Sequence, residues 1–254
     1  MKLLEGKKGL VIGIANRHSI AYGCAKAFHN AGAEVAVTYL NEEAEPYVRP
    51  LAEGLSSPII MPCDVEQEDE LAAVYKRIEQ EWGTLDFVLH SVAFAPHEDL
   101  HGRVTDCSRA GFLQAMDISV YSFIEMARLA EPLMKTGGSL LTLSYYGAEK
   151  VVDNYNVMGP VKAALEGTTR YLAAELGPKN IRVNALSTGP VSTRAASGIN
   201  LFDNLLEQAE NRAPLRRLID IEDVGNMAVG MVSDWGKNVT GNISYVDAGY
   251  HIMS

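Results

Sequence analysis

KKGLVIGIANRHSIAYG (residues 7–23) places a short apolar run, a glycine and the beginning of a helix in direct succession. The run has the length and composition of a buried strand. Gly13 then permits a tight turn, and Ser19 stands where it can cap a helix that begins at Ile20. A strand, a tight turn and a helix in this order form the first half of a βαβ unit, so the stretch predicts an α/β fold.

The same alternation continues through most of the chain. Seven short apolar runs indicate strands at residues 7–13, 34–39, 58–65, 85–93, 139–144, 181–187 and 242–248. Amphipathic stretches between the first six indicate helices at about residues 20–31, 42–55, 68–82, 108–134 and 157–176. Nearly continuous apolar strands flanked by helices are typical of a parallel sheet covered on both faces. No linker, repeat or low-complexity tract divides the chain, so we predict one domain over residues 1–254, a doubly wound (Rossmann) parallel sheet of about seven strands.

The composition argues against several classes of protein. Of 254 residues 47% are hydrophobic, yet no apolar run has the length of a membrane span. The balance of 22 basic and 32 acidic residues gives a net charge of −10, which argues against binding to nucleic acid or to anionic membranes. Cys24, Cys63 and Cys107 are odd in number and, like the six histidines, lack metal-ligand spacing. We therefore expect no metal site, and reduced thiols in the cytoplasm.

The turn after the first strand is a candidate cofactor site, because ligands of doubly wound sheets bind beyond the carboxyl ends of the strands. The turn lacks a GxGxxG pattern. Gly13, Ser19 and a helix N-terminus nevertheless provide the parts that hold a pyrophosphate. An ordinary strand-to-helix turn is the alternative interpretation.

Three other strand ends fit a dinucleotide. Asp64, after the third strand, offers a carboxylate to an adenine amino group, although a helix cap or a solvated turn acid explains it equally well. The segment SVAFAP (91–96), after the fourth strand, consists mostly of small residues, which let the backbone approach a flat ring. An ordinary loop at the end of a strand can have a similar sequence. After the second strand, TYLNEEAE (38–45) contains no arginine or lysine to hold a 2′-phosphate. This absence favours NADH over NADPH.

Candidate catalytic residues lie in SYYGAEKVVDNYNVMGPVKAALEG (144–167). Tyr155 and Lys162 are seven positions apart, about two turns of a helix, so on one helix they would face the same way. An ammonium beside a phenol lowers the pKa of the phenol, which can then stabilise or protonate a developing oxyanion. Pro160 requires the helix to begin at about residues 156–159, which moves Tyr155 to the helix entry. An exposed aromatic beside a solvated lysine is the alternative.

On these residues the chain resembles the short-chain dehydrogenase/reductases, and within them the bacterial NADH-dependent enoyl-[acyl-carrier-protein] reductases. The resemblance covers the whole chain. It is carried by SIAYG (19–23), CDV (63–65), FAP (94–96), DIS-YSF (117–123), LTLSY (141–145), NYNVMG (154–159), IRVNA (181–185), AASGI (195–199) and IEDVGN (221–226). Many members of the superfamily have the lysine four positions after the tyrosine, whereas this subfamily has six residues between them, as here. A 3-oxoacyl or other carbonyl reductase, and a non-catalytic dinucleotide-sensing protein, are the alternatives.

The resemblance implies a role for each matching residue. Tyr155 would hydrogen-bond the thioester carbonyl oxygen and stabilise the enolate, Lys162 would hold the nicotinamide ribose, and Tyr145 would lie near the carbonyl or the enoyl tail. The implied cofactor residues are Gly13, Ser19, Ile20, Leu40, Asp64, Val65, Val92, Lys162, Val191, Ser192, Thr193, Arg194 and Ala195. The implied substrate residues are Ala95, Tyr145, Tyr155, Met158 and Phe202.

The stretch 188–217 is too long for a plain connector. We predict that residues 191–217 form a lid over the acyl chain, although a surface helix would show a similar pattern. Its arginines, Arg194, Arg212, Arg216 and Arg217, are cations that suit the acidic acyl carrier protein implied by the resemblance. The resemblance also implies a homotetramer with the helices at 108–134 and 157–176 at an interface.

Overall fold

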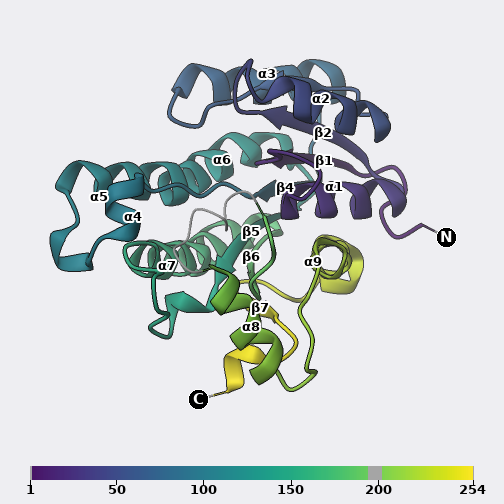
Figure 1. Cartoon of the computed structure of the whole chain (residues 1–254). Coiled ribbons are helices and arrows are strands. Elements are labelled where there is room, and N and C mark those ends of the chain that lie inside the picture. Colours follow the sequence, from purple (N-terminus) through teal and green to yellow (C-terminus); the bar gives the residue numbers. More distant parts are fainter. Residues whose placement is uncertain (1, 194–201, 254) are drawn as a thin grey trace.

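A computed structural model of the chain describes residues 2–193 and 202–253, with the arrangement shown in Figure 1. Seven strands form one parallel sheet in the order β3-β2-β1-β4-β5-β6-β7. They are β1 (Lys8–Ile12), β2 (Glu34–Tyr39), β3 (Ile60–Pro62), β4 (Phe87–His90), β5 (Gly138–Tyr145), β6 (Ile181–Thr188) and β7 (Ile243–Val246). The predicted doubly wound sheet is confirmed. The strand order reverses between β1 and β4, because β2 and β3 are added on one side of β1 and β4 to β7 on the other. Ligands of such sheets bind at this switch point.

Helices cover both faces of the sheet (Figure 1). Each face has its own apolar core. One core joins the strands to α3 (Glu68–Trp82), α6 (Ser122–Ala130) and α7 (Met158–Leu176). The other joins them to α1 (Ile20–Asn30), α2 (Glu45–Gly54) and α9 (Ile221–Val232). The remaining α-helices are α4 (His97–His101), α5 (Arg109–Met116) and α8 (Phe202–Arg212). Within the described part of the chain, no helix is both long enough and apolar enough to cross a membrane.

The single helix predicted over residues 108–134 is wrong. The chain forms α5, then a π-helical turn η2 (Asp117–Tyr121), then α6 and a 3₁₀ turn η3 (Glu131–Leu133). Two buried hydroxyls of this region make hydrogen bonds to β4 and the loop after it. Ser119 Oγ accepts from Phe94 N at 3.0 Å and donates to Phe94 O at 3.3 Å, while Ser122 Oγ lies 2.9 Å from Nε2 of the buried His90. The π turn thereby fixes the loop after β4, and such turns are frequent at functional sites.

Helix α7 begins at Met158, so Pro160 falls in its first turn, as predicted. Tyr155 therefore precedes the helix, and the simple picture of two side chains on one helical face does not hold. The turn that carries Tyr155 has positive φ at Asn154 (63°) and Asn156 (44°), a conformation that asparagine tolerates well. Asn156 Nδ2 also donates to Leu100 O at 2.7 Å, which fixes the turn against α4.

Candidate active site

The turn after β1 lies directly against the loop after β4. Gly13 has a φ of +112°, and a Cβ atom there would stand 2.0 Å from the carbonyl oxygen of Ser91. Ser91 N in turn donates to Ile12 O at 3.0 Å. Only glycine permits this approach of two backbones, which places the two loops side by side at the switch point of the sheet.

Gly13→Ala tests this contact. Both the positive φ and the overlap with Ser91 oppose a side chain, so we expect the free energy of unfolding to fall by about 3 kcal/mol. Chemical denaturation at a fixed protein concentration measures the change. Gly54→Ala is the matched control, because its Cβ atom would meet nothing within 4 Å and its φ is not positive. Equal stability of the two variants would contradict the close backbone contact between Gly13 and Ser91.

Ser19 occupies the N-cap position of α1, as predicted, but its hydroxyl does not cap the helix. Ser19 Oγ instead accepts from Ala15 N and Asn16 N, both at 3.0 Å, and so closes the preceding turn. The first turn of α1, which begins at Ile20, contains no acidic side chain. An anionic group is therefore not repelled at this helix N-terminus, where the helix dipole favours it.

The residues predicted to hold the adenosine half lie at the ends of β2 and β3. Leu40, just after β2, is 53% exposed. Asp64 Oδ1 accepts from Glu66 N at 3.0 Å, a turn contact that still leaves its second carboxylate oxygen. Arg49 is the cation near this end, but its guanidinium is paired with Glu45 (Nε to Oε1 at 2.6 Å). A cation already engaged in this way is a poor receptor for a 2′-phosphate.

Tyr145 and Tyr155 form the centre of the predicted site. Tyr145 ends β5, and its ring lies 4.8 Å from that of Tyr155, with the two planes at 66°. Both side chains are buried. The Tyr145 hydroxyl has no hydrogen-bond partner among the described residues. A buried hydroxyl without a partner costs about 1–3 kcal/mol, so one retained at a strand end is suited to meet a ligand.

Lys162 lies on the first turns of α7 and is 7% exposed. Its Nζ donates to Leu143 O at 2.7 Å. Burial lowers the pKa of Lys162 to about 8, and the charge of Glu166 opposes this decrease. The hydrogen bond to Leu143 O holds the amino group of Lys162 beside the carboxyl end of β5.

The lowered phenol pKa that the sequence predicted is wrong. Burial raises the pKa of Tyr155 above its ordinary value, and the negative charge of Glu166 raises it further. Burial likewise raises the pKa of Tyr145. The cost of removing a phenolate from water is the main cause of both increases. Tyr155 is therefore a neutral hydrogen-bond donor at physiological pH.

The other predicted residues are spread around this centre. Met158 is buried at the start of α7, Ala95 lies in the loop after β4, and Val65 and Val92 are half-buried. After β6, Val191 is buried, Ser192 is exposed and Thr193 is half-buried. Arg194, Ala195 and the side chain of Phe202 lie outside the described part of the structure. The lid over residues 191–217 therefore stays a prediction, although α8 is present within it.

A model of the family described as "Enoyl-(Acyl carrier protein) reductase" matches residues 13–251. The chain belongs to this family. The enoyl-[acyl-carrier-protein] reductase [NADH] of Aquifex aeolicus is 50% identical over 254 residues, covering 100% of this chain and 94% of that protein. Enoyl-[acyl-carrier-protein] reductase [NADH] 1 of Rhizobium meliloti is 49% identical, covering 99% of this chain and 92% of its own.

Solved structures agree with this family assignment. The Anaplasma phagocytophilum reductase in complex with NAD has a TM-score of 0.96 and 52% identity, covering 99% of this chain and 96% of that chain. The Bacillus cereus enoyl-acyl carrier protein reductase with NADP+ and indole naphthyridinone has a TM-score of 0.97 and 48% identity over 100% of both chains. The chain is thus an oxidoreductase of the enoyl reductase family, and the family predicted from the sequence is confirmed.

Three side chains of this enoyl reductase were not found from the sequence. Ser119 makes two hydrogen bonds with the backbone of Phe94 in the loop after β4. Ser144 and Glu166 form a buried pair beside the tyrosines, in which Ser144 Oγ donates to Glu166 Oε1 at 2.6 Å. The buried positions of α7 recur at helical spacing, and Glu166 interrupts this apolar series. That interruption was the signal available in the sequence.

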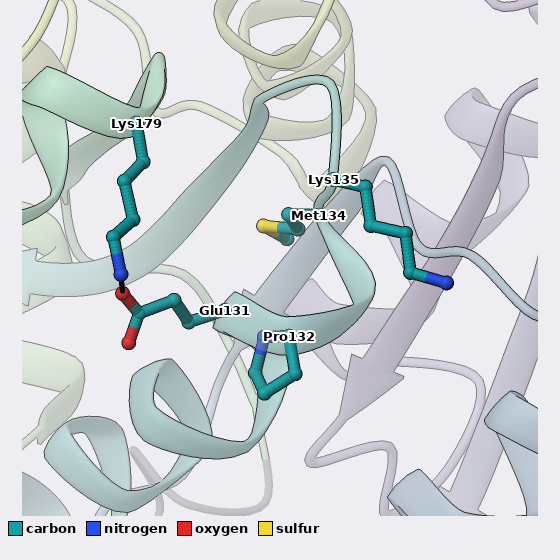
Figure 2. Close-up of a pocket in the computed structure, with 5 residues that line it drawn as sticks. All are labelled: Glu131, Pro132, Met134, Lys135 and Lys179. Atoms are coloured by element: carbon teal, nitrogen blue, oxygen red, sulfur yellow. Dashed lines mark hydrogen bonds and ion pairs between the residues drawn. The ribbon is translucent and has the colours of Figure 1, made fainter.

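A hollow lies at the opposite end of the sheet from these residues. It is lined by Glu131, Pro132, Met134, Lys135 and Lys179, which precede the first residues of β5 and β6 (Figure 2). Lys179 and Glu131 form an ion pair across it. The carboxyl ends of the strands, where doubly wound sheets bind ligands, are on the other side. The hollow is therefore separate from the candidate active site.

Proposed function

We propose that the chain uses NADH to reduce the 2,3 double bond of 2-enoyl thioesters on acyl carrier protein, in fatty acid synthesis. The observation that carries this proposal is the buried group of Tyr145, Tyr155 and Lys162 beside the switch point of the sheet. NADH, when bound, supplies the hydride that is added to C3 of the substrate. The residues of the chain bind and orient the substrate, and they stabilise the enolate that the hydride addition produces.

Tyr155 donates a hydrogen bond to the thioester carbonyl oxygen. Its raised pKa keeps the phenol protonated, so it stabilises the negative charge of the enolate as that charge forms at the oxygen. C2 is then protonated and the saturated thioester results. The unpartnered hydroxyl of Tyr145 suits a second contact near the carbonyl or the enoyl tail. Lys162 would hold the nicotinamide ribose hydroxyls of bound NADH and would keep the local potential positive.

Several features support a bound dinucleotide of the NAD type. The absence of a Cβ atom at Gly13 and of an acidic side chain in the first turn of α1 suits a pyrophosphate. The pairing of Arg49 with Glu45 disfavours a 2′-phosphate. The proposed cofactor residues remain those named from the sequence, including Arg194 and Ala195.

One assay tests the proposal against its alternatives. The consumption of NADH is followed with a 2-enoyl thioester, with a 3-oxoacyl thioester and with no acceptor. We expect turnover with the enoyl thioester alone. Turnover only with the ketone would favour a carbonyl reductase. Binding of NADH without turnover of either acceptor would favour a non-catalytic dinucleotide-sensing protein.

The predicted lid also offers a surface for acyl carrier protein. Arg212, Arg216 and Arg217 are exposed at the end of α8 and after it, although the whole chain is acidic. We expect charge reversal at Arg216 and Arg217 to raise the KM for a carrier-linked substrate about tenfold through electrostatic repulsion. The KM for the same acyl group on free pantetheine should not change. Charge reversal at the exposed Arg77 of α3 is the control, and unchanged carrier kinetics would remove the docking role.

We also propose that the chain is a cytoplasmic homotetramer. Exposed apolar side chains support an interface on α5, α6 and α7, where Leu113 is 55% and Tyr171 is 82% exposed. Phe112 and Ile124 add to this surface. The free thiols of Cys24, Cys63 and Cys107 support a reducing compartment. Sedimentation of the purified chain measures the mass, and a monomer or dimer at micromolar concentration would contradict the tetramer.

A further inference from the structure

The turn that carries Tyr155 is joined to α4 by the side chain of Asn156. Its Nδ2 atom donates to Leu100 O at 2.7 Å, across 56 positions of the chain. Both residues are half-buried. The proposed mechanism uses Tyr155 and assigns no task to the neighbouring asparagine.

The Leu100 end of this hydrogen bond belongs to the segment proposed to meet the substrate. Leu100 N donates to Pro96 O at 2.8 Å. Ser119 Oγ holds the backbone of Phe94 with two hydrogen bonds. Hydrogen bonds thus fix both neighbours of Ala95, the residue in this segment that is proposed to contact the substrate.

The Tyr155 end of the hydrogen bond also has a fixed position. A Cβ atom at Gly147 would stand 2.6 Å from Tyr155 Cδ1 and 3.1 Å from Tyr145 Cδ1, so both rings pack directly on this backbone. The Tyr155 side chain is buried and has no spare room on that side. The place of its hydroxyl therefore follows the place of its own turn, which Asn156 ties to Leu100 O.

We infer that Asn156 is a positioning residue that sets the distance between the Tyr155 hydroxyl and the thioester carbonyl oxygen. This inference rests on the proposed function, in which Tyr155 donates to that oxygen. Asn156 does not touch the reacting atoms in this scheme, and it acts through Tyr155. The stabilisation of a forming oxyanion depends steeply on the distance and angle of its donor, so a loosened turn lowers the rate.

Asn156→Gly tests the inference, because glycine loses the hydrogen bond but accepts the positive φ of 44° at this position. We expect kcat with a 2-enoyl thioester to fall about tenfold, since Tyr155 is no longer held at the correct distance. The affinity for NADH should stay close to that of the unmodified chain, because Lys162 keeps its hydrogen bond to Leu143 O. Steady-state kinetics and a fluorescence titration with NADH measure the two quantities.

Asn154→Gly is the matched control. Asn154 is half-buried in the same turn and has a φ of 63°, but its side chain makes no hydrogen bond within the described part of the chain. We expect its kcat to stay within about twofold of that of the unmodified chain. Asn156→Asp and Asn154→Asp form a second pair, because aspartate tolerates a positive φ and, when ionised, has no hydrogen to donate. This pair serves as the test if Asn156→Gly does not fold, as judged by circular dichroism.

Tyr155→Phe combined with the Asn156 variant that folds separates positioning from general support of the fold. If Asn156 acts through the Tyr155 hydroxyl, its loss should change kcat by less than about twofold when that hydroxyl is already absent. A residue that only supported the fold would lower kcat by the same factor with and without the hydroxyl.

Two results would overturn the inference and leave the proposed function standing. The first is an equal kcat for the matched variants of Asn156 and Asn154. The second is the same fold-loss of kcat on changing Asn156 in the unmodified chain and in Tyr155→Phe. In both cases the unmodified chain still reduces the enoyl thioester. Failure of the unmodified chain to reduce it would instead remove the proposed function, and the role of Asn156 with it.

Discussion

Tyr155→Phe is expected to lower kcat by about 10²- to 10³-fold, because it removes one hydrogen-bond donor from the oxygen that becomes negative. The ring remains, so its contact with Tyr145 and the packing of the core should persist. The affinity for NADH should stay close to that of the unmodified chain, since the phenol acts on the substrate oxygen. Steady-state kinetics with a 2-enoyl thioester and an NADH titration measure the two quantities.

Tyr47→Phe provides the control for this prediction. Tyr47 is an exposed tyrosine of α2, which packs on the opposite face of the sheet from α7, and the loss of its hydroxyl should leave kcat unchanged. A kcat for Tyr155→Phe within threefold of the control would contradict the role of Tyr155. If Tyr155→Phe lowered only the affinity for NADH, Tyr155 would be assigned a contact with the cofactor and not with the substrate.

The fold was predictable from the sequence because its signals are local. Apolar strands such as Leu10 to Ile12 are buried on both sides, so they appear as continuous apolar runs. The π turn at 117–121 had no such signal. It is accompanied by two hydrogen bonds between Ser119 and Phe94, which are 25 positions apart in the chain. A pattern of hydrophobic spacing does not contain that contact.

The candidate site was predictable in its residues and less so in its chemistry. The spacing of Tyr155 and Lys162, with Pro160 between them, correctly placed the beginning of α7. The direction of the Tyr155 pKa shift depended on how much water reaches the phenol, which only the packing of the folded chain determines. Glu166 escaped notice because a glutamate on an amphipathic helix usually faces solvent.

Lys162→Met is expected to weaken NADH binding by about tenfold and to lower kcat/KM by about 10²-fold. Methionine has a similar length and is tolerated in an apolar core, so the change removes the ammonium and little of the packing. The loss of NADH affinity reflects the hydrogen bonds to the ribose, and the loss of turnover reflects the positive potential at the developing enolate. A fluorescence titration with NADH and steady-state kinetics separate the two.

The stability of this variant should distinguish an electrostatic role from a structural one. Removing Lys162 takes away one of the two positive charges, with Arg170, that lower the pKa of Glu166, so this pKa should rise further and the midpoint of thermal unfolding should fall. Lys162→Met combined with Glu166→Gln should recover most of that midpoint, because neither charge is then buried, but it should not recover turnover. Lys76→Met, on the exposed face of α3, controls for the loss of a positive charge elsewhere. Recovery of turnover in the double variant would show that Lys162 serves only to balance Glu166, and the catalytic role proposed for Lys162 would be wrong.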